Sequence, residues 1–175
     1  LGRQWQWQSN YNPSFGMPTS LGFFRLYTYK TNDNFWNIPN LLLQKTPADC
    51  FTVTAKLTLI SKAEGQLGGL IMMGLDYSSL VVKRVGDGFV LQQMTCRNAD
   101  KGGAVIVTPL AHLAKTGQDD NDYQFAIYEE VFLQMKVDGG IVRFAFSRDG
   151  KHFKEVGEPF KMREGKWIGA KMGFV

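Results

Sequence analysis

Short runs of alternating apolar and polar residues, separated by tight turns, most constrain how this chain can fold. In the run 51–59 every second residue is apolar: Phe51, Val53, Ala55, Leu57 and Leu59. Successive side chains of a strand point to opposite faces of a sheet, so this run predicts a strand with one buried face. About a dozen such runs follow one another at roughly 8 to 12 residue spacing. The chain is therefore predicted to be all-β, a two-sheet antiparallel β-sandwich.

Turn residues support the same architecture. Asp87-Gly88 lies between the runs 80–84 and 89–95, and Asp138-Gly139-Gly140 lies between 131–137 and 141–147. Both sequences favour tight β-hairpins. The apolar, glycine-containing run 68–75 predicts a central strand that is covered on both faces. The one stretch that suggests a helix is 110–115.

Composition narrows the function classes. The 175 residues fit one domain, and the net charge of +4 comes from 20 basic and 16 acidic residues that are mixed along the chain. No basic stripe, dinucleotide motif, phosphate-binding loop or membrane-length apolar run occurs in the sequence, so nucleic-acid, nucleotide and membrane partners are not expected. Both ends read as interior structure. We therefore expect residues 1–175 to be a single module of a longer protein.

The acidic residues do not form an evident catalytic pair. A glycosidase needs two carboxyl groups roughly 5 to 9.5 Å apart in one cleft. Glu129 and Glu130 are neighbours within a predicted strand, so they should point to opposite faces. His112 and His152 lack a nucleophile motif nearby. We predict no catalytic residue, although a carboxylate pair drawn from distant strands stays open.

Metal and cysteine chemistry are equally limited. The loop Asp119-Asp120-Asn121-Asp122 is either a solvated acidic loop or a structural Ca²⁺ site, and its spacing differs from the twelve-residue calcium loop. We assign no metal ligand and expect no cofactor. Cys50 and Cys96 allow one disulfide but also fit two free thiols.

Aromatic side chains are the remaining candidates for binding. The chain holds thirteen Phe, six Tyr and four Trp, and those within strands, such as Trp5, Trp7 and Trp167, are expected in the core. Phe35 and Trp36 instead lie in an asparagine-rich loop, where an aromatic residue is either a plug over the core or a platform for a ligand. With the weaker candidate Tyr77, they form the predicted substrate-binding set: Trp36, Phe35 and Tyr77.

Several segments resemble one known family. The resemblance is found in the segments Leu1-Gly2-Arg3-Gln4-Trp5-Gln6-Trp7-Gln8-Ser9-Asn10, Phe146-Ser147-Arg148-Asp149-Gly150 and Trp167-Ile168-Gly169-Ala170-Lys171-Met172-Gly173. They resemble the C-terminal concanavalin A-like domain of family 43 glycoside hydrolases, the β-xylosidase and α-L-arabinofuranosidase group. The resemblance spans nearly the whole chain. Where the family usually reads Trp-Gln-Trp-Asn-His-Asn-Pro, this chain reads Trp-Gln-Trp-Gln-Ser-Asn, without the histidine.

The resemblance implies a concanavalin A-like jelly roll and an accessory role. In that family the catalytic carboxylates belong to an N-terminal five-bladed propeller, on which the sandwich packs, and in some members a sandwich loop walls the active site. The implied partners are that propeller and a plant-cell-wall oligosaccharide, and the implied location is secreted or periplasmic. A carbohydrate-binding module and, more distantly, an intrinsic sandwich glycosidase are the alternatives.

Overall fold

The computed structural model describes residues 2–30, 34–119, 126–166 and 169–175. The helical elements within these ranges are three single 3₁₀ turns: η1 (Pro13–Phe15), η2 (Phe35–Asn37) and η3 (Ala99–Lys101). The strands are β1 (Gln6–Trp7), β2 (Gly16–Pro18), β3 (Phe24–Leu26), β4 (Leu42–Lys45), β5 (Cys50–Ser61), β6 (Leu67–Met73), β7 (Tyr77–Val85), β8 (Gly88–Cys96), β9 (Val105–Leu113), β10 (Gly117–Asp119), β11 (Ala126–Asp138), β12 (Ile141–Ser147), β13 (Lys154–Lys161) and β14 (Lys171–Phe174).

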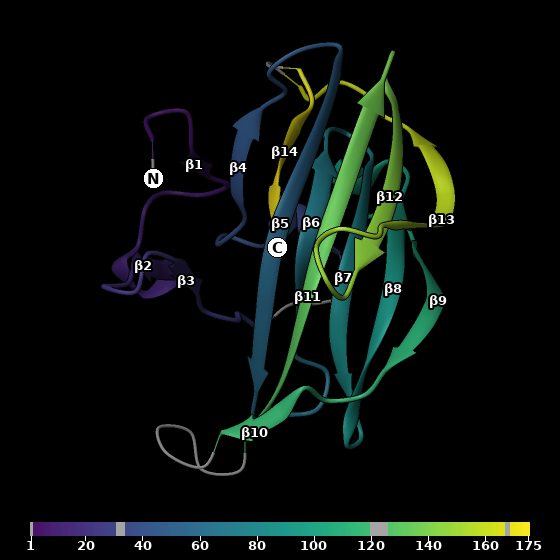
Figure 1. The fold of residues 1–175 in the computed structure, drawn as a ribbon. Coiled ribbons are helices and arrows are strands. Elements are labelled where there is room, and N and C mark those ends of the chain that lie inside the picture. The colour runs from purple at the N-terminus through teal and green to yellow at the C-terminus, as the bar shows by residue number, and fades with distance from the viewer. Residues whose placement is uncertain (1, 31–33, 120–125, 167–168) are drawn as a thin grey trace.

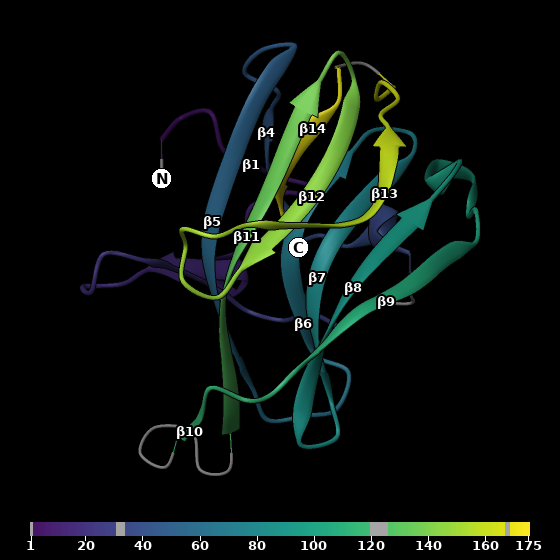
Figure 2. The ribbon, with the colours of Figure 1, turned by 45° about the vertical axis from the view of Figure 1, so that its right-hand side comes forward.

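Two antiparallel sheets lie face to face (Figure 1). One is seven-stranded, in the order β1-β4-β14-β6-β7-β8-β9, and the other has five strands, with β10, β11, β12 and β13 in order and β5 paired to β11. The turned view in Figure 2 shows the same two layers. The predicted two-sheet antiparallel sandwich is confirmed, and the two predicted hairpins join β7 to β8 and β11 to β12.

The long pair β5 and β11 forms much of the five-stranded sheet. Its register runs from Ser61 opposite Ile127 to Cys50 opposite Asp138. Along β5 the burial alternates residue by residue as predicted, with Val53, Ala55 and Leu57 packed against the core and Thr54 and Lys56 between them exposed. Strict alternation thus places one apolar face of this sheet inside the sandwich.

The seven-stranded sheet is covered on both of its faces. In β6, Leu70 and Met72 belong to the cluster between the two sheets, whereas Ile71 belongs to a second cluster under the loop that carries Phe35 and Leu41. Neighbouring residues of one strand therefore enter two different apolar layers. This double coverage confirms the prediction for the run 68–75.

The predicted helix at 110–115 is wrong, because 110–113 continue strand β9. Leu91 pairs with Ala111 and Gln92 pairs with Pro109, so Leu110 is the extra residue of a β-bulge. The bulge breaks the alternation and lets Leu110 and Leu113 both pack against the core cluster. Their spacing of three residues imitates a helical pattern.

Other sequence expectations have mixed outcomes. Cys50 is exposed and Cys96 is buried, and both are free thiols. Trp5 stacks on Phe174 with ring centroids 5.5 Å apart, in agreement with a packing role. Trp167 and positions 120–122 of the predicted acidic loop lie outside the described residues. Among the described residues, no helix has the length and hydropathy to span a membrane.

Candidate functional site

Two of the three predicted binding residues form a buried stack. The rings of Phe35 and Tyr77 are 5.3 Å apart between centroids at 26°, and neither residue exposes any surface. The backbone N–H of Phe35 also donates to the Tyr77 hydroxyl at 3.2 Å. This pair plugs the outer face of the seven-stranded sheet, and neither ring presents a face on which a saccharide could stack.

Trp36, the third predicted residue, is only half-buried. Its loop is held by the Asn34 side chain, whose oxygen accepts from the Trp36 N–H at 2.9 Å. The ammonium nitrogen of Lys166 lies 5.8 Å from the Trp36 ring centroid and 3.5 Å from Asp100 Oδ2. The structure therefore brings Trp36 together with Asp100 and Lys166, which the sequence analysis did not single out.

Asp100 is an unusual neighbour for a loop tryptophan. Its side chain is 8% exposed, and its Oδ1 atom has no hydrogen-bond partner among the residues that the structure describes. Buried polar atoms nearly always have a partner in the protein, in ordered water or in a ligand. Trp36, Asp100 and Lys166, here called the Trp36 cluster, thus offer a ring, a hydrogen-bond acceptor and a cation at one place.

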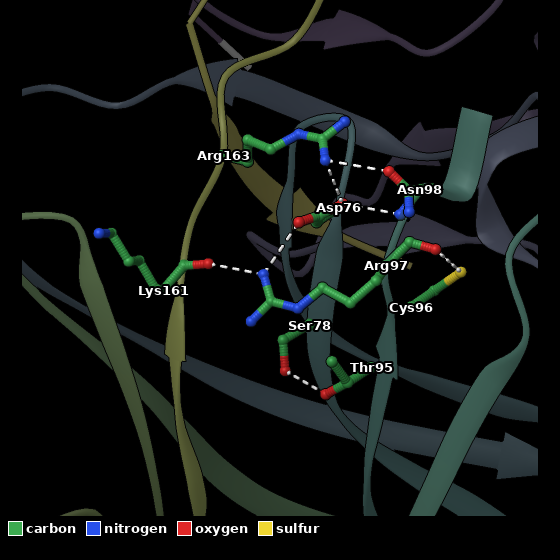
Figure 3. A network of polar contacts seen from close by, with 8 residues as sticks. All are labelled: Asp76, Ser78, Thr95, Cys96, Arg97, Asn98, Lys161 and Arg163. Carbon is green, nitrogen blue, oxygen red and sulfur yellow. Dashed lines mark hydrogen bonds and ion pairs between the residues drawn. The ribbon is translucent and has the colours of Figure 1, made fainter. Parts of the chain in front are cut away.

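A buried carboxylate anchors the two segments that supply Asp100 and Lys166 (Figure 3). Asp76 Oδ1 accepts the backbone N–H of Asn98 at 2.7 Å and lies 3.3 Å from Arg163 Nη1. Asp76 Oδ2 lies 2.9 Å from Arg97 Nη1. Since Asn98 and Arg163 lie two and three residues before Asp100 and Lys166, this network positions the Trp36 cluster.

The surroundings of Asp76 keep it ionised. Burial acts to raise the pKa of the Asp76 carboxyl, but the Asn98 N–H and the two guanidinium groups outweigh burial and leave the pKa below its ordinary value. Arg97 also donates to the carbonyl oxygen of Lys161 at 3.0 Å and lies 4.4 Å from the Phe160 ring centroid. The network thus ties β7 and β8 to the end of β13.

Glu129 and Glu130 point to opposite faces of β11, as predicted. Glu129 is fully buried and pairs with Arg148, whereas Glu130 lies 2.9 Å from Lys56 on the outer face. Burial raises the pKa of Glu129, an effect that Arg148 and a hydrogen bond from Thr116 only partly offset. The two adjacent glutamates cannot act together across one cleft.

Neither histidine lies in a catalytic or metal-binding arrangement within the described part of the chain. His112 is exposed on β9, and His152 is exposed with its Nδ1 2.6 Å from Asp149 Oδ2. No group of three potential metal ligands occurs among the described residues.

Comparison with known protein families identifies the kind of domain to which this chain belongs. Residues 1–175 match the model of the β-xylosidase C-terminal concanavalin A-like domain. The chain belongs to this family. GH43 proteins pair such a domain with a catalytic domain, and the predicted family resemblance is confirmed.

Solved structures share the fold of this GH43 C-terminal domain. A bifunctional GH43-CE protein of Bacteroides eggerthii has a TM-score of 0.77 at 19% identity, over 100% of this chain and 21% of that one. A GH43 protein mutant from Bacillus licheniformis has a TM-score of 0.71 at 17% identity, over 99% and 33%. A GH43_12 protein from a capybara gut metagenome has a TM-score of 0.75 at 17% identity, over 99% and 32%. The domain thus spans a third or less of these proteins, and no curated protein sequence matches it.

Asp76→Asn should lower the free energy of unfolding by about 1 to 3 kcal/mol, because buried hydrogen bonds to charged groups are lost. Since the folded pKa of Asp76 is below 3.8, this stabilisation is present above that pH and is lost as the pH falls through the folded pKa. Urea unfolding at pH 7 and pH 3 measures both effects. Asp87→Asn is the control, because its fully exposed carboxylate lies 3.9 Å from Arg84. Equal losses in the two variants would contradict the anchoring role.

Glu129→Gln should change the pH dependence of stability in the opposite sense. The folded pKa of Glu129 is above 4.5, so the folded state holds its proton longer and wild-type stability falls as the pH rises from 4.5 through that pKa. The glutamine variant lacks this decline and should gain melting temperature relative to the wild type over that range. Differential scanning calorimetry from pH 4.5 to 7.5, with Glu130→Gln as the control, measures it. Parallel wild-type and variant profiles would refute the assignment.

Proposed function

We propose that this chain is a non-catalytic accessory domain of a family 43 glycoside hydrolase that acts on xylan or arabinan side chains, and that it packs on the catalytic domain of the same polypeptide. The observation that supports this proposal is the coverage. The three GH43 structures described above match 99% of this chain or more, yet the chain spans a third or less of each of them. The catalytic domain of the proposal is the five-bladed propeller that the resemblance implies. A secreted or periplasmic location belongs to the same proposal.

The carboxylate geometry agrees with a non-catalytic role. Glu129, the buried glutamate on the inner face of β11, pairs with Arg148 and has no exposed surface. A general acid must reach the glycosidic oxygen of its substrate. Glu129 has no exposed surface, so it cannot reach a glycosidic oxygen in this structure.

The isolated chain should not hydrolyse nitrophenyl β-xyloside or nitrophenyl α-L-arabinofuranoside, whereas the complete polypeptide should hydrolyse at least one of them. Initial rates at equal molar concentration provide the comparison. The complete polypeptide carrying Glu129→Gln should keep the wild-type kcat. Turnover by the isolated chain that Glu129→Gln abolishes would replace this proposal with the intrinsic glycosidase.

Carbohydrate binding at the Trp36 cluster is a second candidate function. It is favoured by one observation: the unpartnered Asp100 Oδ1 lies in the same cluster as a half-buried tryptophan ring. Saccharide sites combine an aromatic face with a few placed polar groups. The proposed ligand is a neutral xylo- or arabino-oligosaccharide, with a hydroxyl group that donates to Asp100.

Trp36→Ala should abolish any retention of the chain on insoluble xylan or arabinan, and Asp100→Asn should weaken it, because the asparagine replaces the carboxylate acceptor. Affinity electrophoresis or isothermal titration with xylohexaose and arabinohexaose measures the binding. Tyr11→Ala removes an aromatic side chain that is 67% exposed and serves as the matched control. Retention that survives Trp36→Ala would eliminate this site.

A further inference from the structure

The strands β2 and β3 form a hairpin that belongs to neither large sheet. Within the described part of the chain they pair with each other alone, from Gly16 opposite Leu26 to Pro18 opposite Phe24. Figures 1 and 2 both show this hairpin projecting sideways from the sandwich, on the side where the chain begins. A lone two-stranded hairpin is at best marginally stable in water, so it depends on what it packs against.

Aromatic rings anchor the hairpin to the sandwich. Trp7 of β1 lies 5.4 Å from Phe15 and 6.3 Å from Phe24 between ring centroids. The carbonyl oxygen of Tyr27 accepts the Asn40 side-chain N–H at 2.7 Å. These contacts fix the direction in which the hairpin projects.

The tip of the hairpin is an ordered turn. The Thr19 N–H donates to the Phe23 carbonyl oxygen at 2.9 Å, and the Thr19 hydroxyl donates to the same oxygen at 2.9 Å. Gly22 closes the turn with φ +84, a conformation that suits glycine. Leu21 is thus held out from the protein by a hydrogen-bonded turn, which limits the conformational entropy lost on burial.

Exposed apolar side chains are concentrated on and beside this hairpin. Of the ten large exposed hydrophobic residues in the described part of the chain, six lie within 11–29: Tyr11 67%, Met17 49%, Leu21 79%, Phe23 50%, Tyr27 40% and Tyr29 54%. We call these six the hairpin patch. The Tyr27 hydroxyl lies 3.4 Å from Met17 Sδ, so these two members touch each other. Clustered exposed apolar side chains mark interaction sites, and tyrosine and phenylalanine are enriched in the cores of protein interfaces.

The charged residues of the segment that carries the hairpin patch have one sign. Residues 1–30 contain Arg3, Arg25 and Lys30 and no Asp or Glu. An interface gains specificity when its rim charges are complementary. The partner surface that fits is therefore apolar at its centre and acidic at its rim.

We infer that the hairpin patch is the surface on which the catalytic domain of the same polypeptide docks. This inference rests on the proposed function. The matching family is a C-terminal domain, so in its members the catalytic domain enters through the strand that corresponds to β1. Trp7 of β1 packs against Phe15 and Phe24 of the hairpin segment, and a domain tethered at β1 meets the patch at high effective concentration.

The test uses the complete polypeptide. Leu21→Asp combined with Phe23→Asp should separate the two domains, so that one cooperative thermal transition becomes two and the radius of gyration in X-ray scattering increases. The control is Ile106→Asp combined with Val107→Asp, which are 64% and 47% exposed on the distant strand β9. It should keep the single transition. If the double hairpin variant does not fold, Leu21→Ser alone replaces it, because that side chain is 79% exposed.

The outcomes separate this inference from the proposed function. A hairpin variant that keeps the wild-type transition and radius overturns the docking surface but leaves the accessory role. A wild-type polypeptide with two independent transitions overturns both. A wild-type dimer that the hairpin variant converts to monomer, with the single transition kept, assigns the patch to a second copy of the chain and overturns the inference.

Discussion

The coverage of the seven-stranded sheet on both faces is the constraint on which the rest of this structure depends. Alternate residues of β6 and β7 enter two apolar layers, so both faces must be shielded from water. The five-stranded sheet shields one face. The loop with Phe35, Ile38 and Leu41 shields the other, and all three of these side chains are buried.

This second layer explains why aromatic residues of one loop have different roles. Phe35 stacks on Tyr77 and completes the apolar layer. Trp36, the next residue, lies at the margin of that layer, where its ring meets Lys166. The position of Trp36 thus follows from how the loop covers the sheet. The Asp76 network places the polar side chains of Asp100 and Lys166 beside it.

The Trp36 cluster and the hairpin patch differ in their chemistry. The Trp36 cluster combines one ring with a carboxylate and an ammonium group, a set that suits a polar ligand with hydroxyl groups. The hairpin patch is broad, aromatic and flanked by basic residues, a combination that suits a protein surface. The two proposals therefore place the catalytic domain and an oligosaccharide on different surfaces of one domain.

The fold class, the main strands and the opposed directions of Glu129 and Glu130 could all be predicted from the order of the residues alone. These features follow from local rules, because alternation and Asp-Gly turns act within a few residues. Sequence could not determine that Leu110 lies in a bulge, since its spacing from Leu113 imitates a helix. Nor could it show that Tyr77 is covered by Phe35, or that Asp100 meets Lys166. Those contacts join residues 42 and 66 positions apart, and only the packing of the sheets, with Asp76 between Asn98 and Arg163, brings them together.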